Sequence, residues 1–245
     1  MSSTKAEASA ANIKQGDVVP PDSFCSANPM RDLDRLTSRF EIAVENFFRS
    51  AFDLQANEAA YQAWYAASVI SEFGVSRVYR EVHLMRTQRA ELVLPEPLVG
   101  FEKGNELVPD LCVSSEEAID ARHTRARPPE LDASGMLDSL AIITEFKATA
   151  STGKPTHPAA IRRDIRKLGL FAEAHATKGT NPLATYMVIL DNHRRDDGTA
   201  SSRYRPDRMS RLLGRVAEKW PESAPKPVVL VGGEDGVDRY AEFGA

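Results

Sequence analysis

Three charged residues lie inside segments that the sequence otherwise marks as buried β-strands. Asp110 belongs to the apolar run 106–114, whereas Glu145 and Lys147 stand two residues apart in the apolar run 139–148. A charged side chain in such a strand is costly to bury unless it is paired or has a function. These residues are therefore the first candidates for a chemical site.

The period of a β-strand places two of them together. Successive strand residues point to opposite faces of a sheet, so Glu145 and Lys147 share one face. Ala141 and Ile143 are expected on that face, and Ile142, Thr144 and Phe146 on the other. If the two strands pair, Asp110 reaches the same edge. The carboxylates of Asp110 and Glu145 and the backbone carbonyl of Phe146 would then form an oxygen-rich site suited to Mg²⁺ or Mn²⁺.

Two helices and a strand are expected before this site. Apolar residues recur every three or four positions from residue 31, and a second helix is predicted over 57–74, with Asn57 as its N-cap and Gly74 as its stop. A period of two then predicts a strand over 76–85. Its two faces would be Val78, Arg80, Val82 and Leu84 against Tyr79, Glu81 and His83.

Helices and strands alternate in the second half. Residues 159–174 predict a basic amphipathic helix whose apolar stripe is Ile161, Ile165, Leu168 and Ala172. A strand over 184–192, a helix over 207–220 and a strand over 227–233 follow. The order is helix, helix, three strands, helix, strand, helix and strand. It predicts an α/β fold with a central mixed sheet flanked by helices.

Two segments interrupt this pattern. Residues 1–30 have no apolar period and predict a disordered leader. Residues 115–138 are rich in charge and proline and predict an inserted loop. The remainder, 31–245, is long enough to bury one core, so we expect a single domain.

The order of elements, with Asp110 in the second strand and Glu145-Phe146-Lys147 in the third, resembles the PD-(D/E)xK nuclease superfamily. The resemblance covers about residues 57–192. It implies a restriction-endonuclease-like core of helix, three strands, helix and strand. Thirty-five positions separate Asp110 from Glu145, so the inserted loop must account for the excess length.

The resemblance implies a Mg²⁺-dependent nuclease that cuts phosphodiester bonds. We expect DNA as the substrate ahead of RNA, and the sequence leaves the choice between them open. Asp110 and Glu145 would hold the metal, and Lys147 would orient the attacking water or stabilise charge in the transition state. A glutamate on the first core helix would complete the metal shell, with Glu58 as first candidate and Glu72 as second. Basic side chains of the next helix would hold the nucleic-acid backbone, namely Arg162, Arg163, Arg166 and Lys167.

Two other interpretations stay open. The chain could be a catalytically silent module of the same fold that binds nucleic acid or a protein partner. It could also be a plain α/β protein whose charged strand ends are surface ion pairs, with Asp110 and Glu145 too far apart for one ion. The sequence leaves open the nucleic-acid target, endo or exo cleavage, and whether the chain forms a homodimer or joins a partner protein.

The overall charge argues against a nucleic-acid binder, but the charge is segregated. The net charge is -4 and the sequence pI about 5.8, whereas nucleic-acid binders commonly have basic surfaces. Residues 154–219 nevertheless hold 14 Lys and Arg against 7 Asp and Glu. A local excess of basic residues in the half that follows Lys147 can bind phosphates even when the whole chain is acidic.

Several other protein classes are excluded by the sequence. No segment approaches the roughly 18 consecutive apolar residues of a membrane span, and the first thirty residues lack the apolar stretch of a secretory signal, so we expect a cytoplasmic protein without a membrane partner. Cys25 and Cys112 alone cannot build a disulfide framework or a zinc cluster. The phosphate loop GxxxxGK[ST], the zinc motif HExxH and the nucleophile motif GxSxG are absent.

Overall fold

Most helices and strands lie where the spacing of apolar residues in the sequence predicts them. The computed structural model describes residues 29–82, 108–117, 119, 137–149, 157–178, 181–194, 203–218, 220 and 225–241. The helices are α1 (Pro29–Ala51), α2 (Glu58–Phe73), α4 (Pro158–Lys178) and α5 (Pro206–Ala217). The strands are β1 (Val78–Arg80), β2 (Leu111–Ser114), β3 (Leu140–Ala148), β4 (Ala184–Leu190), β5 (Val228–Gly233) and β6 (Gly236–Tyr240). The predicted leader up to residue 28, and most of the predicted insertion, lie outside the described residues.

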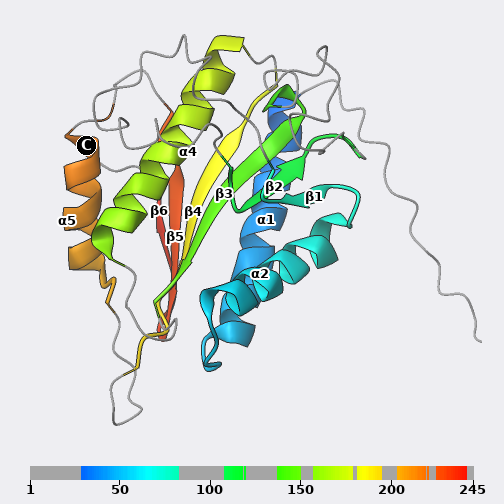
Figure 1. The fold of residues 1–245 in the computed structure, drawn as a ribbon. Coiled ribbons are helices and arrows are strands. Elements are labelled where there is room, and N and C mark those ends of the chain that lie inside the picture. Colours follow the sequence, from blue (N-terminus) through cyan, green and yellow to red (C-terminus); the bar gives the residue numbers. More distant parts are fainter. Residues whose placement is uncertain are drawn as a thin grey trace, which may run out of the picture.

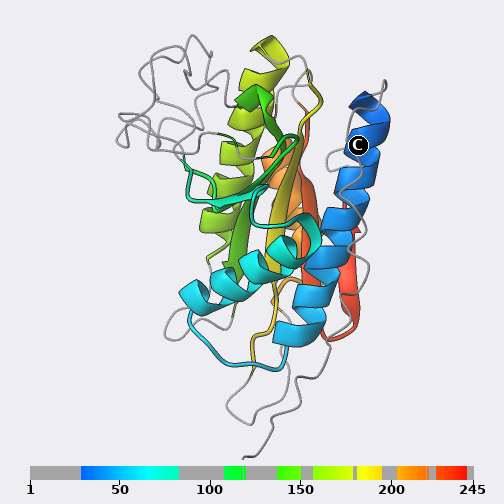
Figure 2. The same cartoon turned by 90° about the vertical axis from the view of Figure 1, so that its right-hand side faces the viewer.

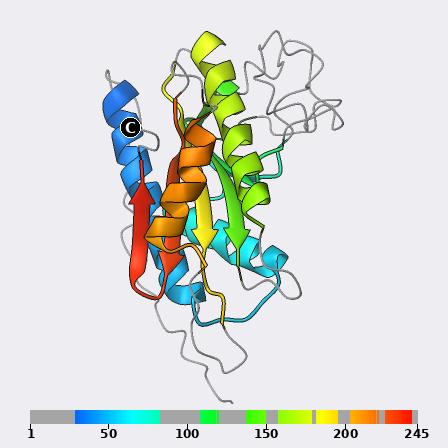
Figure 3. The ribbon, with the colours of Figure 1, turned by 90° about the vertical axis from the view of Figure 1, so that its left-hand side faces the viewer.

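The strands form one six-stranded mixed sheet in the order β1-β2-β3-β4-β5-β6. Strands β1, β2 and β3 are antiparallel neighbours, β3, β4 and β5 are parallel, and β6 is antiparallel to β5. Helices α1 and α2 cover one face, and α4 and α5 cover the other (Figures 1 and 3). The α/β class with a mixed sheet flanked by helices is confirmed. None of the described helices is long and apolar enough to cross a bilayer.

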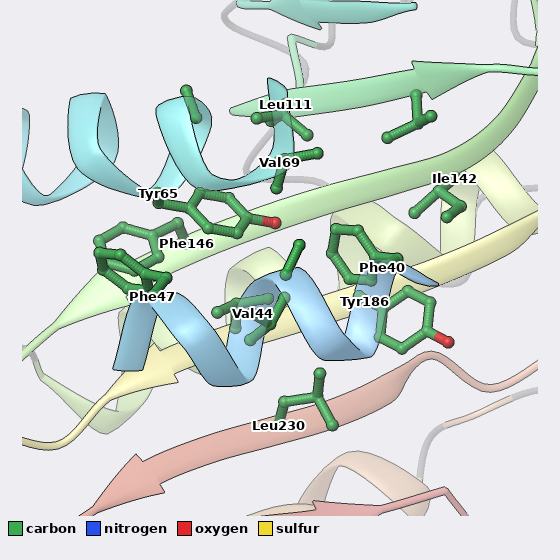
Figure 4. Close-up of a cluster of buried hydrophobic side chains, with 14 of the residues drawn as sticks. Phe40, Val44, Phe47, Tyr65, Val69, Leu111, Ile142, Phe146, Tyr186 and Leu230 are labelled. Atoms are coloured by element: carbon green, nitrogen blue, oxygen red, sulfur yellow. The ribbon is translucent and has the colours of Figure 1, made fainter. Parts of the chain in front are cut away.

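Each face of the sheet packs its own hydrophobic core. Helices α1 and α2 lie together on one face of the sheet (Figure 2). The core beneath them is aromatic (Figure 4): the ring of Tyr65 stacks on Phe146 at 5.3 Å between centroids, and Phe47 meets Phe146 edge-on. On the opposite face Ile161, Ile165 and Leu168 of the predicted α4 stripe join the core, and Ala172 is buried as well. Because both faces are covered, the central strands are mostly apolar, and Glu145 and Lys147 of β3 are charged exceptions.

Strand β3 is longer than its neighbour β2, so among the described strands its carboxyl end extends beyond the β2 pairing. β2 pairs with β3 from Leu140 to Thr144, whereas β4 pairs with β3 from Ile142 to Ala148. Within the described residues, the stretch from Glu145 to Ala148 therefore has a strand partner on one side only. This stretch carries Glu145 and Lys147, so both charged residues lie at the carboxyl end of β3, beyond the part that β2 covers.

Local backbone irregularities explain two differences from the predicted pattern. The register between β2 and β3 shifts after Val113, so Ala141 packs with Ile142 under α1 and α2, and not with Ile143. Glu81 has a positive φ of 50°, and the alternation predicted for 76–85 fails there. Val78 consequently lies in one core and Val82 in the other.

The last strand, β6, was not predicted. Its five residues are mostly exposed, so they show no apolar period. The available signal was the turn Glu234-Asp235, followed by Gly236 at a φ of 121°, which glycine tolerates best. A short turn that contains Asp and is followed by Gly, directly after a buried strand, is consistent with a β-hairpin.

Candidate active site

The residue before β2 and the end of β3 are joined directly. Asp110 precedes β2, and its Oδ2 accepts a hydrogen bond from the backbone N–H of Phe146 at 2.8 Å. In an extended residue the N–H and C=O groups point to the same side of the strand, so the Phe146 carbonyl faces the Asp110 side of β3. Burial raises the pKa of the Asp110 carboxyl, and the nearby Lys147 ammonium opposes that rise. The structure thus brings Asp110 to the Glu-Phe-Lys segment.

Glu145 is a buried carboxylate with a lysine against it. Its side chain is 2% exposed, and its Oε1 lies 2.6 Å from Nζ of Lys167 on α4. Burial, and then the negative charge of Asp110, raise the pKa of Glu145 well above its ordinary value. Two ionised carboxyl groups near each other in a buried site are unfavourable without a cation. The Lys167 ammonium supplies that cation.

Lys147 lies between two carboxylates from opposite faces of the sheet. Its Nζ is 3.2 Å from Oε1 of Glu58 at the start of α2 and 3.2 Å from Oδ2 of Asp164 on α4. Burial lowers the pKa of Lys147, but Asp164, Asp110 and Glu58 raise it more, so the net pKa lies above the ordinary value. Lys147 is therefore held as an ammonium ion. Both helices can reach it because no described strand covers that edge of β3.

The start of α2, and with it Glu58, is fixed by a hydrogen-bond network. The Asn57 side chain accepts a hydrogen bond from the N–H of Ala60, as predicted for the N-cap. Tyr61 Oη donates to the carbonyl of Leu54 at 2.6 Å, and Asn192 Nδ2 donates to Tyr61 Oη at 2.8 Å. These contacts tie the first turn of α2 to the residues that follow β4.

The charged residues around Glu145 and Lys147 form a cluster with Asp110, Asp164 and Lys167. Of the two helix glutamates proposed from the sequence, Glu58 belongs to this cluster and Glu72 does not. Glu72 lies at the other end of α2 and forms an ion pair with Arg39 of α1, with 2.7 Å between Oε1 and Nε. The guanidinium of Arg39 also lies over the ring of Phe73. Glu72 therefore has a structural role in joining α1 to α2.

Two members of the cluster come from α4, and sequence reasoning missed their positions. Asp164 was not considered a candidate, although its place three residues before Lys167 puts both on one side of the helix. The sequence pattern groups Lys167 with Arg162, Arg163 and Arg166 in one basic face. The structure separates it from them, because its side chain is 13% exposed and its Nζ also donates to the carbonyl of Val108 at 2.9 Å. A long lysine side chain can reach inward from a helix flank.

Arginines of α4 and α5 lie near one another around Tyr204. Burial and the nearby charge of Arg162 lower the pKa of Arg166. The guanidinium of Arg208 on α5 lies over the ring of Tyr204 at 5.7 Å. Burial raises the pKa of the Tyr204 hydroxyl to about 12, although the charges of Arg208, Arg203 and Arg162 each lower it. Basic groups from two helices therefore meet around Tyr204.

The donor atoms at the end of β3 suit a hard divalent cation, but lysines close the cluster. Asp110, Glu145 and the Phe146 carbonyl are the oxygen donors that Mg²⁺ prefers. In the part of the chain that the structure describes, no three His, Cys, Asp or Glu side chains converge closely enough to hold a metal ion. Lys167 pairs with Glu145, and Lys147 with Glu58 and Asp164. The oxygen donors fit a metal ion. Without one, Lys147 and Lys167 balance the negative charge of the carboxylates.

No family model, curated protein or solved structure matches this chain. The family resemblance inferred from the sequence therefore stays a prediction. It rests on the order of the elements and on the residues gathered at the end of β3.

Proposed function

We propose that this protein is a Mg²⁺-dependent nuclease that hydrolyses phosphodiester bonds in DNA. One observation carries the proposal: Asp110, Glu145 and Lys147 meet at the carboxyl end of β3, where the strand edge is open within the described residues. Two carboxylates beside a fixed ammonium are the groups that metal-assisted phosphodiester hydrolysis needs.

The two carboxylates would hold the metal. The Phe146 N–H orients the Asp110 carboxylate, and Glu145 belongs to β3 itself. Both carboxylates are therefore positioned by the β3 backbone. When bound, Mg²⁺ supplies charge neutralisation on the phosphate and lowers the pKa of the attacking water. Glu58 would complete the metal shell directly or through a water molecule.

Lys147 would act on the scissile phosphate or on the attacking water. Its ammonium is kept charged by Asp164, Asp110 and Glu58, and it is fixed between α2 and α4. A preoriented cation stabilises the negative charge that develops in the transition state without a reorganisation cost. Glu58 and Asp164 would position Lys147 for this role.

Arginines near the site would bind the nucleic-acid backbone. The charge of Arg162 acts on Arg166, one turn further along α4, and Arg162 and Arg208 both act on Tyr204. Like charges gathered in this way repel one another, and an anionic backbone would relieve that repulsion. Such contacts supply affinity without sequence preference.

Cleavage of supercoiled plasmid DNA with and without Mg²⁺ tests the proposal. The wild type is expected to nick or linearise the plasmid only with the metal, and Glu145→Gln and Lys147→Met are expected to lose that activity. Glu58→Gln should reduce cleavage, whereas Glu72→Gln, on the same helix but paired with Arg39, should leave it unchanged. Full cleavage by folded Glu145→Gln or Lys147→Met would exclude this site.

A catalytically silent module that binds nucleic acid is the second candidate. The observation that favours it is the charge compensation within the cluster, since Glu145, Glu58 and Asp164 each already face a lysine. Such a module would bind DNA with little response to Mg²⁺. Calorimetric titration with Mg²⁺ separates the two candidates, because a nuclease must bind the metal and a silent module need not.

A further inference from the structure

Lys167 places a positive charge where the carboxylate of Glu145 would meet a metal ion. Its Nζ lies 2.6 Å from Glu145 Oε1 and 2.9 Å from the carbonyl of Val108, and both side chains are largely buried. The contact joins the middle of α4 to the end of β3 from within the core face of the sheet. Glu145 thus has a cation beside it before any metal binds.

A divalent ion and this ammonium would compete for the same carboxylate. Mg²⁺ binds carboxylate oxygens at about 2.0–2.1 Å. An ion at that distance from Glu145 would lie within a few ångströms of an ammonium held 2.6 Å from Oε1. Two cations so close repel strongly, because little water screens charges in a buried site. Metal binding therefore favours withdrawal of the Lys167 ammonium from Glu145.

The partners of the two lysines differ, and this difference singles out Lys167. Besides Glu58, Lys147 has Asp164, which is not a proposed metal ligand, and can keep its charge with a metal nearby. Lys167 has one carboxylate partner among the described contacts, Glu145, and its other partner is a neutral backbone carbonyl. A metal held by Asp110 and Glu145 would take over both carboxylates whose charge Lys167 offsets.

We propose that Lys167 is an internal cation that compensates Glu145 in the metal-free protein and competes with the divalent ion for that carboxylate. The proposal rests on the metal site of the proposed function and adds a limit on metal affinity. It predicts that the occupancy of the site depends on the charge at position 167. The metal-free fold is stabilised by the same contact that weakens metal binding.

Calorimetric titration of the full chain with Mn²⁺ alone, without nucleic acid and at about pH 8 where free carboxyls are ionised, tests this inference. Lys167→Met is expected to lower the Kd for Mn²⁺ at least about tenfold, since a buried like charge is removed. Lys167→Arg keeps the charge and should bind no more tightly than wild type. Arg215→Met on α5 is the control for the change in net charge and should leave the Kd unchanged.

A double variant locates the gained affinity. Asp110→Asn combined with Lys167→Met should lose the tighter binding, because one proposed metal ligand is absent. Should Lys167→Met fail to fold, as judged by circular dichroism, Lys167→Gln serves in its place, since the shorter amide is also neutral and can still donate a hydrogen bond.

The outcomes separate this inference from the proposed function. An unchanged or higher Kd in the neutral variants, with Mn²⁺ binding intact in the wild type, would overturn the role of Lys167 and leave the metal site standing. A higher Kd would mean that Lys167 serves to keep Glu145 ionised. Absence of Mn²⁺ binding in the wild type and in every variant would overturn the metal site and the competition together.

Discussion

The backbone N–H of Phe146 donates a hydrogen bond to Oδ2 of Asp110, thirty-six residues earlier in the chain. The contact joins the residue before β2 to the segment of β3 that carries both Glu145 and Lys147. It orients Asp110 through the backbone, so the position of this carboxylate does not depend on the flexible end of another side chain.

Substitution of Asp110 should separate its structural role from its chemical role. Asp110→Asn keeps an oxygen that can accept the Phe146 N–H, and it removes a charge that burial disfavours, as the raised pKa shows. We expect Asp110→Asn to be as stable as the wild type or more stable. Asp110→Ala leaves a part-buried N–H without its acceptor and should lower the free energy of unfolding by about 1–3 kcal/mol relative to Asp110→Asn.

Urea unfolding of the two variants, together with plasmid cleavage, measures both effects. Both variants should lack metal-dependent cleavage, because neither has the carboxylate. Equal stability of the two variants would show that the hydrogen bond to Phe146 contributes nothing measurable.

Asp164 should matter through Lys147. Asp164→Asn removes one of the two carboxylates within 3.2 Å of the Lys147 ammonium while keeping the shape of the side chain. Loss of a group that orients a site residue typically costs between about tenfold and a hundredfold, so we expect kcat for cleavage to fall by that factor. Steady-state cleavage of a defined duplex gives kcat and KM separately.

The control for Asp164 is Asp207→Asn on α5. Asp207 pairs with Arg211 on the exposed surface, and its loss removes the same charge without touching the site. If Asp164→Asn and Asp207→Asn reduced kcat equally, a positioning role for Asp164 would be wrong.

Close packing at Gly169 should make this position intolerant of alanine. A Cβ at Gly169 in α4 would lie 2.3 Å from Cη2 of Trp220, whereas a Cβ at Gly214 in α5 would meet no atom within 4 Å. Gly169→Ala should lower the free energy of unfolding by about 1–3 kcal/mol through overpacking. Gly214→Ala should raise it by up to about 1 kcal/mol, because alanine favours helix.

Thermal and urea unfolding of the two glycine variants provide the comparison. Gly169→Ala combined with Trp220→Ala should recover part of the loss attributed to the clash. A stabilised Gly169→Ala protein would contradict the close approach of Trp220 to α4.

His175 should make the protein less stable as the pH falls. Burial lowers the pKa of this imidazole below its ordinary value of 6.5, and the Asp138 carboxylate, 3.9 Å from Nε2, opposes the shift only in part. The unfolded chain therefore takes up a proton at a higher pH than the folded chain does. The free energy of unfolding falls as the pH decreases through 6.5, and this loss is complete below the folded pKa.

Urea unfolding of wild type and His175→Gln over a series of pH values isolates this contribution, because other titrating groups are common to both proteins. The wild type should lose more stability than His175→Gln between neutral pH and the folded pKa. Parallel stability profiles for the two proteins would show that His175 does not titrate differently on folding.

The sequence predicted most of the elements because each has a local signal. The stripe of α4 follows from a spacing of three and four, and the limits of α2 follow from Asn57 and Gly74. The same reasoning missed β6, whose residues are exposed and carry no apolar period. It also failed at Glu81, since a positive φ in a glutamate leaves no mark in the hydrophobic pattern.

By itself, the sequence determined that Glu145 and Lys147 share a face of β3, because the period of a strand depends only on the backbone. Only the tertiary structure decided which side chains come to meet them. It selected Glu58 over Glu72, added Asp164, and turned Lys167 inward. These contacts depend on strand register, on the length by which β3 exceeds β2, and on how α2 and α4 pack against opposite faces. Those quantities are set by residues distant in the chain, and local patterns do not encode them.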